Sequence, residues 1–531
     1  MSALQDEVSR LWVLARAIEQ ERDPQRIRRV YERIVEIDPL QPAAWLKLSQ
    51  LSLHDGSYRD ARNAALRAAE AISLSRRWRA LPHVTMQLLH FDERALVSSL
   101  VASADWEDDA VLAQAAVLAQ RLWLADDAAT ALALLDRAMP SQPANFRLHS
   151  ARGEVLNHLG RFEEAETEYL RCLELEPAYP YAYLSLVQNR RSKVPGARVG
   201  RIRAARAAAS TEKDGITLDY AMFHEQDAAG DIDAAWLALE SGARMQRAIV
   251  AFDGAAEQRN LEALIESFAD APPLPGDRAP VGSRRCHVFI VGLPRSGTTL
   301  LDRMFGNHPL VGSAGELNSF SRSLSWEIDA YYEPPPSEGI ARRARDCDWK
   351  AVGTGYVEAT SARHPDKPYL LDKNPQNIYN AGYIAKAIPQ ARILCLSRNP
   401  MDACFSNMKE LFAPASYGYS YDQRELAEHF ARFRMLVACW RRQLPGQFHV
   451  VDYEALVDDP ERELERAMHF CGLDFDPAYV DITRNKSPVS TASSAQVREP
   501  LNRRGLGAWR RYRQYLQPLA ARLTELGIEV D

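Results

Sequence analysis

The sequence lacks a long apolar run, a targeting segment and any excess of positive charge. No stretch approaches the about 18 consecutive apolar residues that a membrane helix needs. Residues 1–23 form a charged amphipathic segment without the apolar core of a signal peptide. A net charge of −6 over 531 residues gives no general affinity for nucleic acid or acidic membranes. We therefore expect a cytoplasmic protein with neither nucleic acid nor membrane as a partner, in which any anion site is local.

Cysteine is also scarce. The seven cysteines are scattered, odd in number and never spaced as C-x-x-C, which argues against a disulfide framework and a zinc site. Apolar residues make up 46% of the chain and charged residues 26%, as in ordinary globular proteins. Because 531 residues exceed what one hydrophobic core supports, we expect two or three domains with reduced thiols.

A repeated helix-pair pattern fills much of the first half. Between Phe146 and Pro177, small, aromatic and turn residues occur at the positions typical of a tetratricopeptide repeat, and Pro143 lies 34 positions before Pro177. The residues that define this unit are Gly153, Gly160, Phe162, Ala165 and Tyr169. Further units occupy residues 45–65, 119–143 and 218–249, a degenerate first unit ends at Pro39, and residues 77–108 keep no clean register.

Such helix pairs must stack to bury their apolar stripes, which predicts an all-α tetratricopeptide solenoid over residues 1–250. The concave face of such an array usually binds a peptide or protein, although the array could equally form a homodimer or brace a second domain. A proline- and glycine-rich stretch at 271–283 ends the helical pattern. We therefore place a linker at 251–284 and a second domain at 285–531.

Residues 286–300, CHVFIVGLPRSGTTL, predict a strand, a glycine loop and a helix. In this order the free N–H groups of the loop and of the helix N-terminus converge on one point, which forms an anion site. The candidate binding residues are Pro294, Arg295, Ser296, Gly297, Thr298 and Thr299. The pattern G-x-x-x-x-G-T-T lacks the lysine of nucleotide hydrolases, and Thr298 stands in its place. This argues against an ordinary ATP or GTP enzyme.

The PRSGTT sequence resembles the 5′-phosphosulfate loop of sulfotransferases, which use 3′-phosphoadenosine 5′-phosphosulfate (PAPS) as sulfuryl donor. A second motif lies about 100 residues later, where Arg398 ends a predicted strand at 391–398 and Ser406 follows about two turns into a helix. Their pattern, R-x-P-x-D-x-x-x-S, resembles the family's 3′-phosphate signature. A guanidinium and a hydroxyl suit a terminal phosphate, because the guanidinium grips it in a bidentate manner.

Two residues match the proposed catalytic groups of protein-tyrosine sulfotransferases. Glu316 follows a glycine turn close in sequence to the anion loop. A negatively charged carboxylate there opposes anion binding, so its presence calls for a functional explanation. The resemblance implies that it is the base that takes the acceptor's proton. Lys373 ends a predicted strand at 369–373, facing the crevice where α/β sheets bind ligands, and the resemblance implies that it stabilises the transferring group. A helix-terminal glutamate and a surface lysine are the structural alternatives.

The end of the chain adds weaker matches. Tyr453, near the end of a predicted strand at 448–457, matches a tyrosine of the nucleotide site, although a packing role is as consistent with the sequence. Residues 493–502 resemble a loop that closes over the nucleotide, and residues 503–510 resemble one that touches the 3′-phosphate. The candidates in these loops are Ser493, which matches a catalytic serine that contacts the sulfuryl group, and Ser494, Gln496, Val497, Arg504 and Arg510. Ala508 and Glu410 replace a lysine and an arginine of the relatives.

The chain therefore resembles bacterial tetratricopeptide-repeat sulfotransferases. The predicted fold is an all-α solenoid followed by a P-loop-type α/β domain with a mostly parallel sheet. The implied reaction moves a sulfuryl group from PAPS to a hydroxyl without a metal, releasing adenosine 3′,5′-bisphosphate, and a protein tyrosine presented by the repeats is the favoured acceptor. A glycan or small-molecule acceptor, a nucleotide kinase and a scaffold with an inactive transferase domain are the alternatives.

Overall fold

The computed structural model describes residues 2–19, 23–189, 194–269, 273–274, 285–412, 417–485 and 498–530. They form two compact units, one of Met1–Leu156 with Arg322–Tyr332 and the other of Asn157–Ser321 with Glu333–Asp531. The boundaries of these units differ from those of the predicted domains, which are 1–250, 251–284 and 285–531. The predicted domain boundaries stay a prediction. A helix, α16 (Gly254–Ala269), lies inside the stretch that we predicted as a linker.

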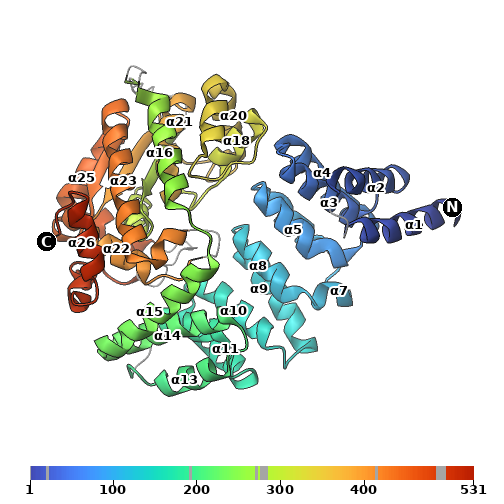
Figure 1. Cartoon of the computed structure of the whole chain (residues 1–531), viewed down its shortest axis with the longest axis horizontal. Helices are drawn as coiled ribbons and strands as arrows, with labels where there is room; N and C mark the ends of the chain where they lie inside the picture. The colour runs from blue at the N-terminus through green and yellow to red at the C-terminus, as the bar shows by residue number, and fades with distance from the viewer. Residues whose placement is uncertain are drawn as a thin grey trace. The chain divides into compact units, whose positions relative to one another are not determined.

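The first unit consists mainly of helix pairs (Figure 1). Its helices are α1 (Ser2–Ile18), α2 (Pro24–Ile37), α3 (Pro42–His54), α4 (Tyr58–Ser75), α5 (Leu81–His90), α6 (Arg94–Ala102), α7 (Asp109–Leu112), α8 (Ala115–Leu124), α9 (Ala128–Ala138) and most of α10 (Phe146–His158). Small side chains such as Ala61 and Ala65 are fully buried where α4 packs on α3. Residues 77–108, which keep no repeat register, still form the pair α5 and α6.

The second unit contains the later helix pairs together with a parallel sheet. Its first helices are α11 (Phe162–Leu175), α12 (Pro180–Gln188), α13 (Val199–Ala208), α14 (Glu212–Ala229), α15 (Ile232–Ile249) and α16. Gly230 ends α14 with a left-handed φ of 83°, and the Asp231 carboxylate caps α15 by accepting from the Ala234 N–H. These features produce the tight turn that the predicted repeat at 218–249 requires.

The sheet has five parallel strands in the order β2-β3-β1-β4-β5. They are β1 (Cys286–Gly292), β2 (Val311–Ser313), β3 (Tyr369–Lys373), β4 (Arg392–Ser397) and β5 (Phe448–Asp452). The helices of this part are α17 (Thr298–Phe305), α19 (Glu338–Arg343), α20 (Trp349–Thr360), α21 (Ala381–Ala387), α22 (Pro400–Met408), α23 (Gln423–Gln443), α24 (Tyr453–Asp458), α25 (Pro460–Phe470) and α26 (Gln517–Glu525). Helix α18 (Ser319–Ile328) begins in this unit, and its residues from Arg322 onward belong to the first unit. The predicted fold class is therefore confirmed.

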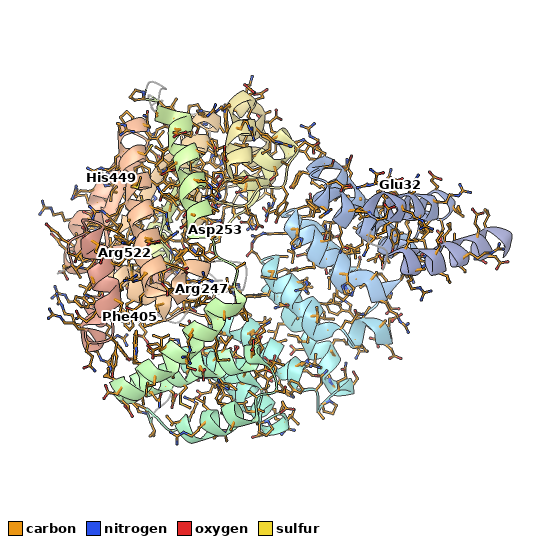
Figure 2. All side chains as sticks on the ribbon, viewed as in Figure 1. Glu32, Arg247, Asp253, Phe405, His449 and Arg522 are labelled. Carbon is orange, nitrogen blue, oxygen red and sulfur yellow. The ribbon has the colours of Figure 1, made fainter. Side chains whose placement is uncertain are left out.

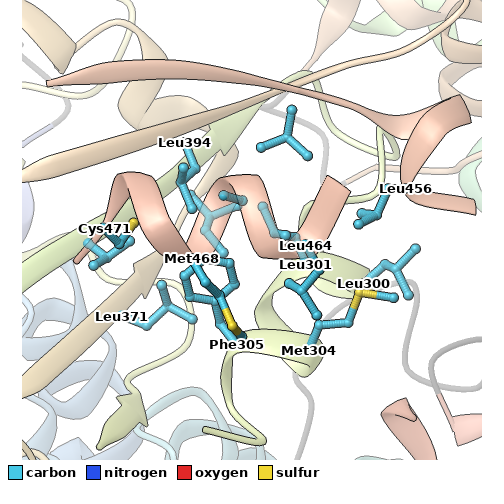
Figure 3. Close-up of a cluster of buried hydrophobic side chains, with 14 of the residues drawn as sticks. Leu300, Leu301, Met304, Phe305, Leu371, Leu394, Leu456, Leu464, Met468 and Cys471 are labelled. Atoms are coloured by element: carbon cyan, nitrogen blue, oxygen red, sulfur yellow. The ribbon is translucent and has the colours of Figure 1, made fainter. Parts of the chain in front are cut away.

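Helices α17 and α25 cover one face of the sheet. Figure 3 shows Leu301 and Phe305 of α17 beside Leu394 of β4 and Met468 of α25, and these side chains belong to one buried cluster. The other face carries Phe289 of β1, whose ring lies 5.4 Å from that of Tyr356 in α20. Because β1 is buried along its whole length, it reads as the continuous apolar run seen in the sequence.

Helices α14 and α15 brace the C-terminal segment of the second unit. The Tyr512 hydroxyl donates to Asp227 at 2.6 Å, and the ring of Tyr515 stacks on Trp236 with centroids 5.0 Å apart. Arg247 of α15, labelled in Figure 2, bonds to both carboxylate oxygens of Glu425 in α23 at 2.6 and 2.7 Å. Helices that resemble repeats are thus built into the same compact unit as the sheet.

Within the described ranges, no helix combines the length and apolar character of a membrane span. All seven cysteines are free thiols, as the scattered pattern predicted, and six of them are buried.

His287 makes the stability of this sheet depend on pH. Its ring is 2% exposed in β1, neither ring nitrogen has a hydrogen-bond partner among the described residues, and burial lowers its pKa to about 4. A histidine whose folded pKa is depressed adds stability above its unfolded pKa of 6.5, and that stability is lost as the pH falls. We predict a loss of roughly 3 kcal/mol between pH 8 and pH 4 from this group.

Urea unfolding of the wild type and of His287→Leu across this range measures the effect. The variant should show a shallower loss of stability with falling pH, because leucine has no proton to bind. Equal slopes in the two proteins would contradict the assignment.

Candidate functional site

The predicted site residues follow strands that end at one edge of the sheet. Register pairs Ile290 of β1 with Lys373 of β3, and Gly292 of β1 with Leu396 of β4. Ser397 at the end of β4 pairs with Asp452 at the end of β5. Since parallel neighbours end at the same edge, the segments that follow β1, β3, β4 and β5 meet there, where α/β sheets bind ligands.

The phosphate loop turns sharply between β1 and α17. Arg295 and Gly297 both have left-handed backbones, with φ of 63° and 104°. The buried Ser296 hydroxyl donates to the Leu293 carbonyl at 2.7 Å, and the amide of Asn407 in α22 donates to the Pro294 carbonyl at 2.8 Å. The first N–H groups of α17, from Thr298, lie at the positive end of its dipole, so the turn can hold an anion.

Arg398 joins this loop to the rest of the edge. One guanidinium nitrogen, Nη1, donates to the Arg295 carbonyl at 2.7 Å and contacts the Ser406 hydroxyl at 3.3 Å. The other, Nη2, donates to the Gly505 carbonyl at 2.5 Å. Arg398 and Ser406 lie about 100 residues after the phosphate loop in the chain. The structure therefore brings distant parts of the sequence together.

Tyr453 packs against two glycines at this point. Its ring carbon Cδ2 would lie 2.4 Å from a Cβ added at Gly297, and its hydroxyl 2.8 Å from one added at Gly505. The Arg398 guanidinium sits over the same ring, 4.5 Å from its centroid. Only glycine permits these approaches, so the PRSGTT glycine is required for packing as well as for its backbone angle.

Asp402 holds the C-terminal segment and was given no role in the sequence analysis. Its buried carboxylate accepts from the backbone N–H groups of Gly507 at 2.6 Å and Trp509 at 3.3 Å. It occupies the acidic position of R-x-P-x-D-x-x-x-S, so the motif itself carried a signal. Nearby, Arg504 pairs with Glu499 on the surface, and the exposed Arg510 lies 5.8 Å from the Trp509 ring.

Lys373 and Glu316 form an ion pair at the end of β3. The ammonium is 2% exposed and bonds to the carboxylate, which is 41% exposed. The Lys373 N–H donates to the Gly315 carbonyl at 2.9 Å, which continues the pairing of β2 and β3 beyond the strands and places Glu316 beside the lysine. The two predicted catalytic residues are thus adjacent, with the carboxylate on the solvent side.

The side chain of Arg295 lies beside the carboxylate of Glu410. Its Nε lies 3.6 Å from Glu410, which is itself 3.4 Å from the amide of Gln188 in α12. Glu410 occupies the position where the sequence comparison expected an arginine. This carboxylate lowers the positive charge near the loop, so the backbone and Arg398 become the main candidates for binding an anion.

Four predicted residues, Ser493, Ser494, Gln496 and Val497, lie outside the described residues. The chain is described again from Arg498, whose Nη2 donates to the His158 carbonyl at 3.3 Å. In the portions that the structure describes, no three His, Cys, Asp or Glu side chains are grouped so that they could hold a metal ion.

Comparisons with known proteins point to one family. The model of the sulfotransferase family matches residues 287–477. A putative protein-tyrosine sulfotransferase of Caenorhabditis briggsae is 26% identical over 234 residues, covering 42% of this chain and 80% of the relative. An uncharacterized protein of Aquifex aeolicus is 26% identical over 401 residues, covering 74% of this chain. This chain spans only 52% of that relative's length.

Among solved structures, the sulfotransferase domain of the Synechococcus PCC 7002 olefin synthase covers 44% of this chain and 91% of its own length, with 19% identity and a TM-score of 0.32. The family match covers the strands, the phosphate loop, Glu316, Lys373 and Arg398. The part of the chain that forms this site is therefore similar to the sulfotransferase family and, among its members, to protein-tyrosine sulfotransferases, and helix pairs precede it in the chain.

Proposed function

We propose that the protein transfers a sulfuryl group from PAPS to an acceptor hydroxyl. The observation that carries this proposal is the contact of Arg398 with both the Arg295 carbonyl and Ser406. Arg398 and Ser406, which the sequence predicts to bind the 3′-phosphate, thus lie beside the loop predicted to bind the 5′-phosphosulfate, and this proximity supports one nucleotide that reaches both. The match of the sulfotransferase family model to residues 287–477 supports the same reaction class.

The residues present fit such a donor. Nε of Arg398 is buried and has no hydrogen-bond partner among the described residues, and an anionic oxygen would satisfy it. The loop from Pro294 to Thr299 would hold the 5′-phosphosulfate through backbone N–H groups, and Ser406 would add a hydroxyl to the 3′-phosphate. Tyr453 fixes the arrangement because it packs on the loop and under Arg398.

Glu316 and Lys373 would carry out the transfer. Sulfuryl transfer, like phosphoryl transfer, spreads negative charge over the equatorial oxygens of an in-line transition state, so positioning and cations provide most of the catalysis. The half-exposed Glu316 carboxylate can accept the proton of an attacking hydroxyl. Protonation weakens its ion pair with Lys373, and the ammonium is then available to the transferring group.

A protein tyrosine presented by the helix pairs in the cytoplasm is the acceptor and setting that we favour. Similarity to a putative protein-tyrosine sulfotransferase over 42% of the chain supports a phenolic hydroxyl. A glycan or small-molecule hydroxyl is the alternative within the class, and an inactive transferase domain on a repeat scaffold is the alternative outside it. Mass spectrometry of candidate acceptors after incubation with PAPS separates these cases.

Arg398→Ala should weaken the binding of adenosine 3′,5′-bisphosphate roughly 10- to 100-fold, because charge-assisted hydrogen bonds are each worth about 1.5–3 kcal/mol. Isothermal titration calorimetry of the full chain measures this. Arg522→Ala is the matched control, since Arg522 pairs with Glu428 on α23 and Figure 2 labels it on α26. No binding by the wild type would favour the scaffold.

Gly297→Ala should abolish nucleotide binding and lower the melting temperature. The added methyl group meets the Tyr453 ring at 2.4 Å, in addition to the cost of about 1–2 kcal/mol for a left-handed backbone. Gly446→Ala isolates the backbone cost, because Gly446 has φ of 81° with nothing within 4 Å of an added Cβ. If both variants lost the same stability and kept nucleotide affinity, Tyr453 would not be packed against the loop.

Glu316→Gln should reduce kcat about 10²- to 10⁴-fold with a tyrosine peptide as acceptor, which is the range for loss of a general base. Its affinity for adenosine 3′,5′-bisphosphate should stay within about twofold, since the carboxylate does not hold the donor. Steady-state kinetics and calorimetry on the same preparation provide both values. Full turnover by this variant would remove Glu316 from the mechanism.

A further inference from the structure

The C-terminal segment, residues 505–515, touches the proposed donor site at its first residue. The Gly505 carbonyl accepts from Nη2 of Arg398 at 2.5 Å, and the Arg295 carbonyl accepts from Nη1 of the same side chain at 2.7 Å. These two bonds fix the plane of the guanidinium. They leave its buried Nε, which has no hydrogen-bond partner among the described residues, for a ligand. The position of the C-terminal segment therefore determines how Arg398 is presented to the donor.

Helix α22 holds this segment at two points. The Asp402 carboxylate accepts from the Gly507 N–H at 2.6 Å. Phe405, which Figure 2 labels, is buried and lies next to Ser406 in the same helix. Its ring packs against that of Tyr512, with centroids 4.9 Å apart. The helix that carries the proposed phosphate-binding serine is thus fixed to the C-terminal segment.

The helix pair α14 and α15 holds the other end of the segment. The Tyr512 hydroxyl donates to the Asp227 carboxylate of α14 at 2.6 Å, and Arg511 pairs with the same carboxylate at 3.0 Å. The Tyr515 ring stacks on Trp236 of α15, with centroids 5.0 Å apart and an angle of 8° between the planes. Three consecutive turns of contact therefore tie the segment to helices that the sequence analysis placed in a repeat.

Tyr512 connects these two supports. It is 1% exposed, and its ring lies between Phe405 of α22 and two aromatic rings of the helix pair, Phe223 at 6.1 Å and Trp236 at 6.3 Å. Close-packed side chains transmit a displacement because no free volume absorbs it. Any shift of α14 at Asp227 would therefore move the C-terminal segment relative to α22.

We propose that the helix pair α14–α15 is part of the donor site and that Asp227, acting through Tyr512, is a positioning residue for Arg398. This role rests on the proposed sulfuryl transfer and deepens it, because it assigns a repeat-like helix pair to donor binding instead of acceptor presentation. The segment meets Arg398, the proposed partner of the 3′-phosphate. Asp227 therefore sets the preference for a nucleotide that carries a 3′-phosphate over one that lacks it.

The test is isothermal titration calorimetry of the full chain with adenosine 3′,5′-bisphosphate and with adenosine 5′-monophosphate. Asp227→Ala should weaken binding of the bisphosphate roughly three- to tenfold, the worth of one ordinary hydrogen bond, and change binding of the monophosphate less than about twofold. Tyr512→Phe keeps the ring and removes the hydroxyl, so it should act in the same direction. The double variant should lose no more than Asp227→Ala alone, because both changes remove the same bond.

Kinetics with PAPS and a tyrosine peptide provide a second readout. Donor KM of Asp227→Ala should rise by the same factor as the bisphosphate affinity falls, while kcat changes less than about twofold, because Asp227 does not touch the reacting atoms. A fall in kcat with an unchanged donor KM would contradict the role.

Asp231→Ala is the matched control. Asp231 lies in the turn between the same two helices and caps α15 by accepting from the Ala234 N–H at 3.2 Å. Its loss should lower the melting temperature and keep the ratio of the two nucleotide affinities, because the contacts above do not involve it.

Three results would overturn the role of Asp227 while the proposed transfer stands. They are an equal loss for both nucleotides in Asp227→Ala, the same change of ratio in Asp231→Ala, and tighter binding of the bisphosphate by Asp227→Ala. The last would mean that the Gly505 carbonyl competes with the phosphate for Arg398. Absence of nucleotide binding by the wild type would overturn the proposed function itself.

Discussion

The arrangement of this site depends on one guanidinium. Arg398 donates to the carbonyl of Arg295 in the phosphate loop and to the carbonyl of Gly505 in the C-terminal segment, and it lies over the ring of Tyr453. Because one of these partners follows β1, one follows β5 and one lies in the C-terminal segment, a single side chain fixes their mutual positions. An arginine suits this task better than a lysine, since its planar fork serves several acceptors at once.

The second constraint is the compensation of buried charge at the end of β3. The Lys373 ammonium is 2% exposed, and it pairs with the Glu316 carboxylate. The Arg295 side chain is likewise matched by Glu410. Positive groups at this edge are thus held by carboxylates, which prepares them for a negatively charged ligand without the penalty of isolated buried cations. In the proposed function, the backbone of the loop and Arg398 would therefore bind the anion.

Local patterns in the sequence predicted β1, β3 and β4 well, but the strand predicted at 448–457 was too long: β5 ends at Asp452, and Tyr453 begins helix α24. The apolar runs of β1 and β4 are bounded by glycine, proline or polar residues, and the observed strand β4 lies within one residue of the predicted limits at each end. The sequence marked Glu316, Lys373 and Arg398 as candidates because each lies at or shortly after the end of a strand. Helix α16 was missed because the predicted linker was drawn from residue 251, although Leu261, Leu264 and Phe268 form a buried helical stripe there.

Contacts between distant segments could not be read from the sequence. Asp302 lies in α17 and Ser313 at the end of β2, and the packing of these two elements brings the side chains within hydrogen-bond distance. No motif in the sequence marks either residue. The role of Asp402 required the fold to bring residues 507–509 to it.

A crystal structure of the full chain with adenosine 3′,5′-bisphosphate tests the central claim most directly. The account predicts the 5′-phosphate at the N-terminus of α17 and the 3′-phosphate on Arg398 and Ser406 of the same molecule. A nucleotide bound elsewhere, or one that reaches only one of these groups, would contradict it.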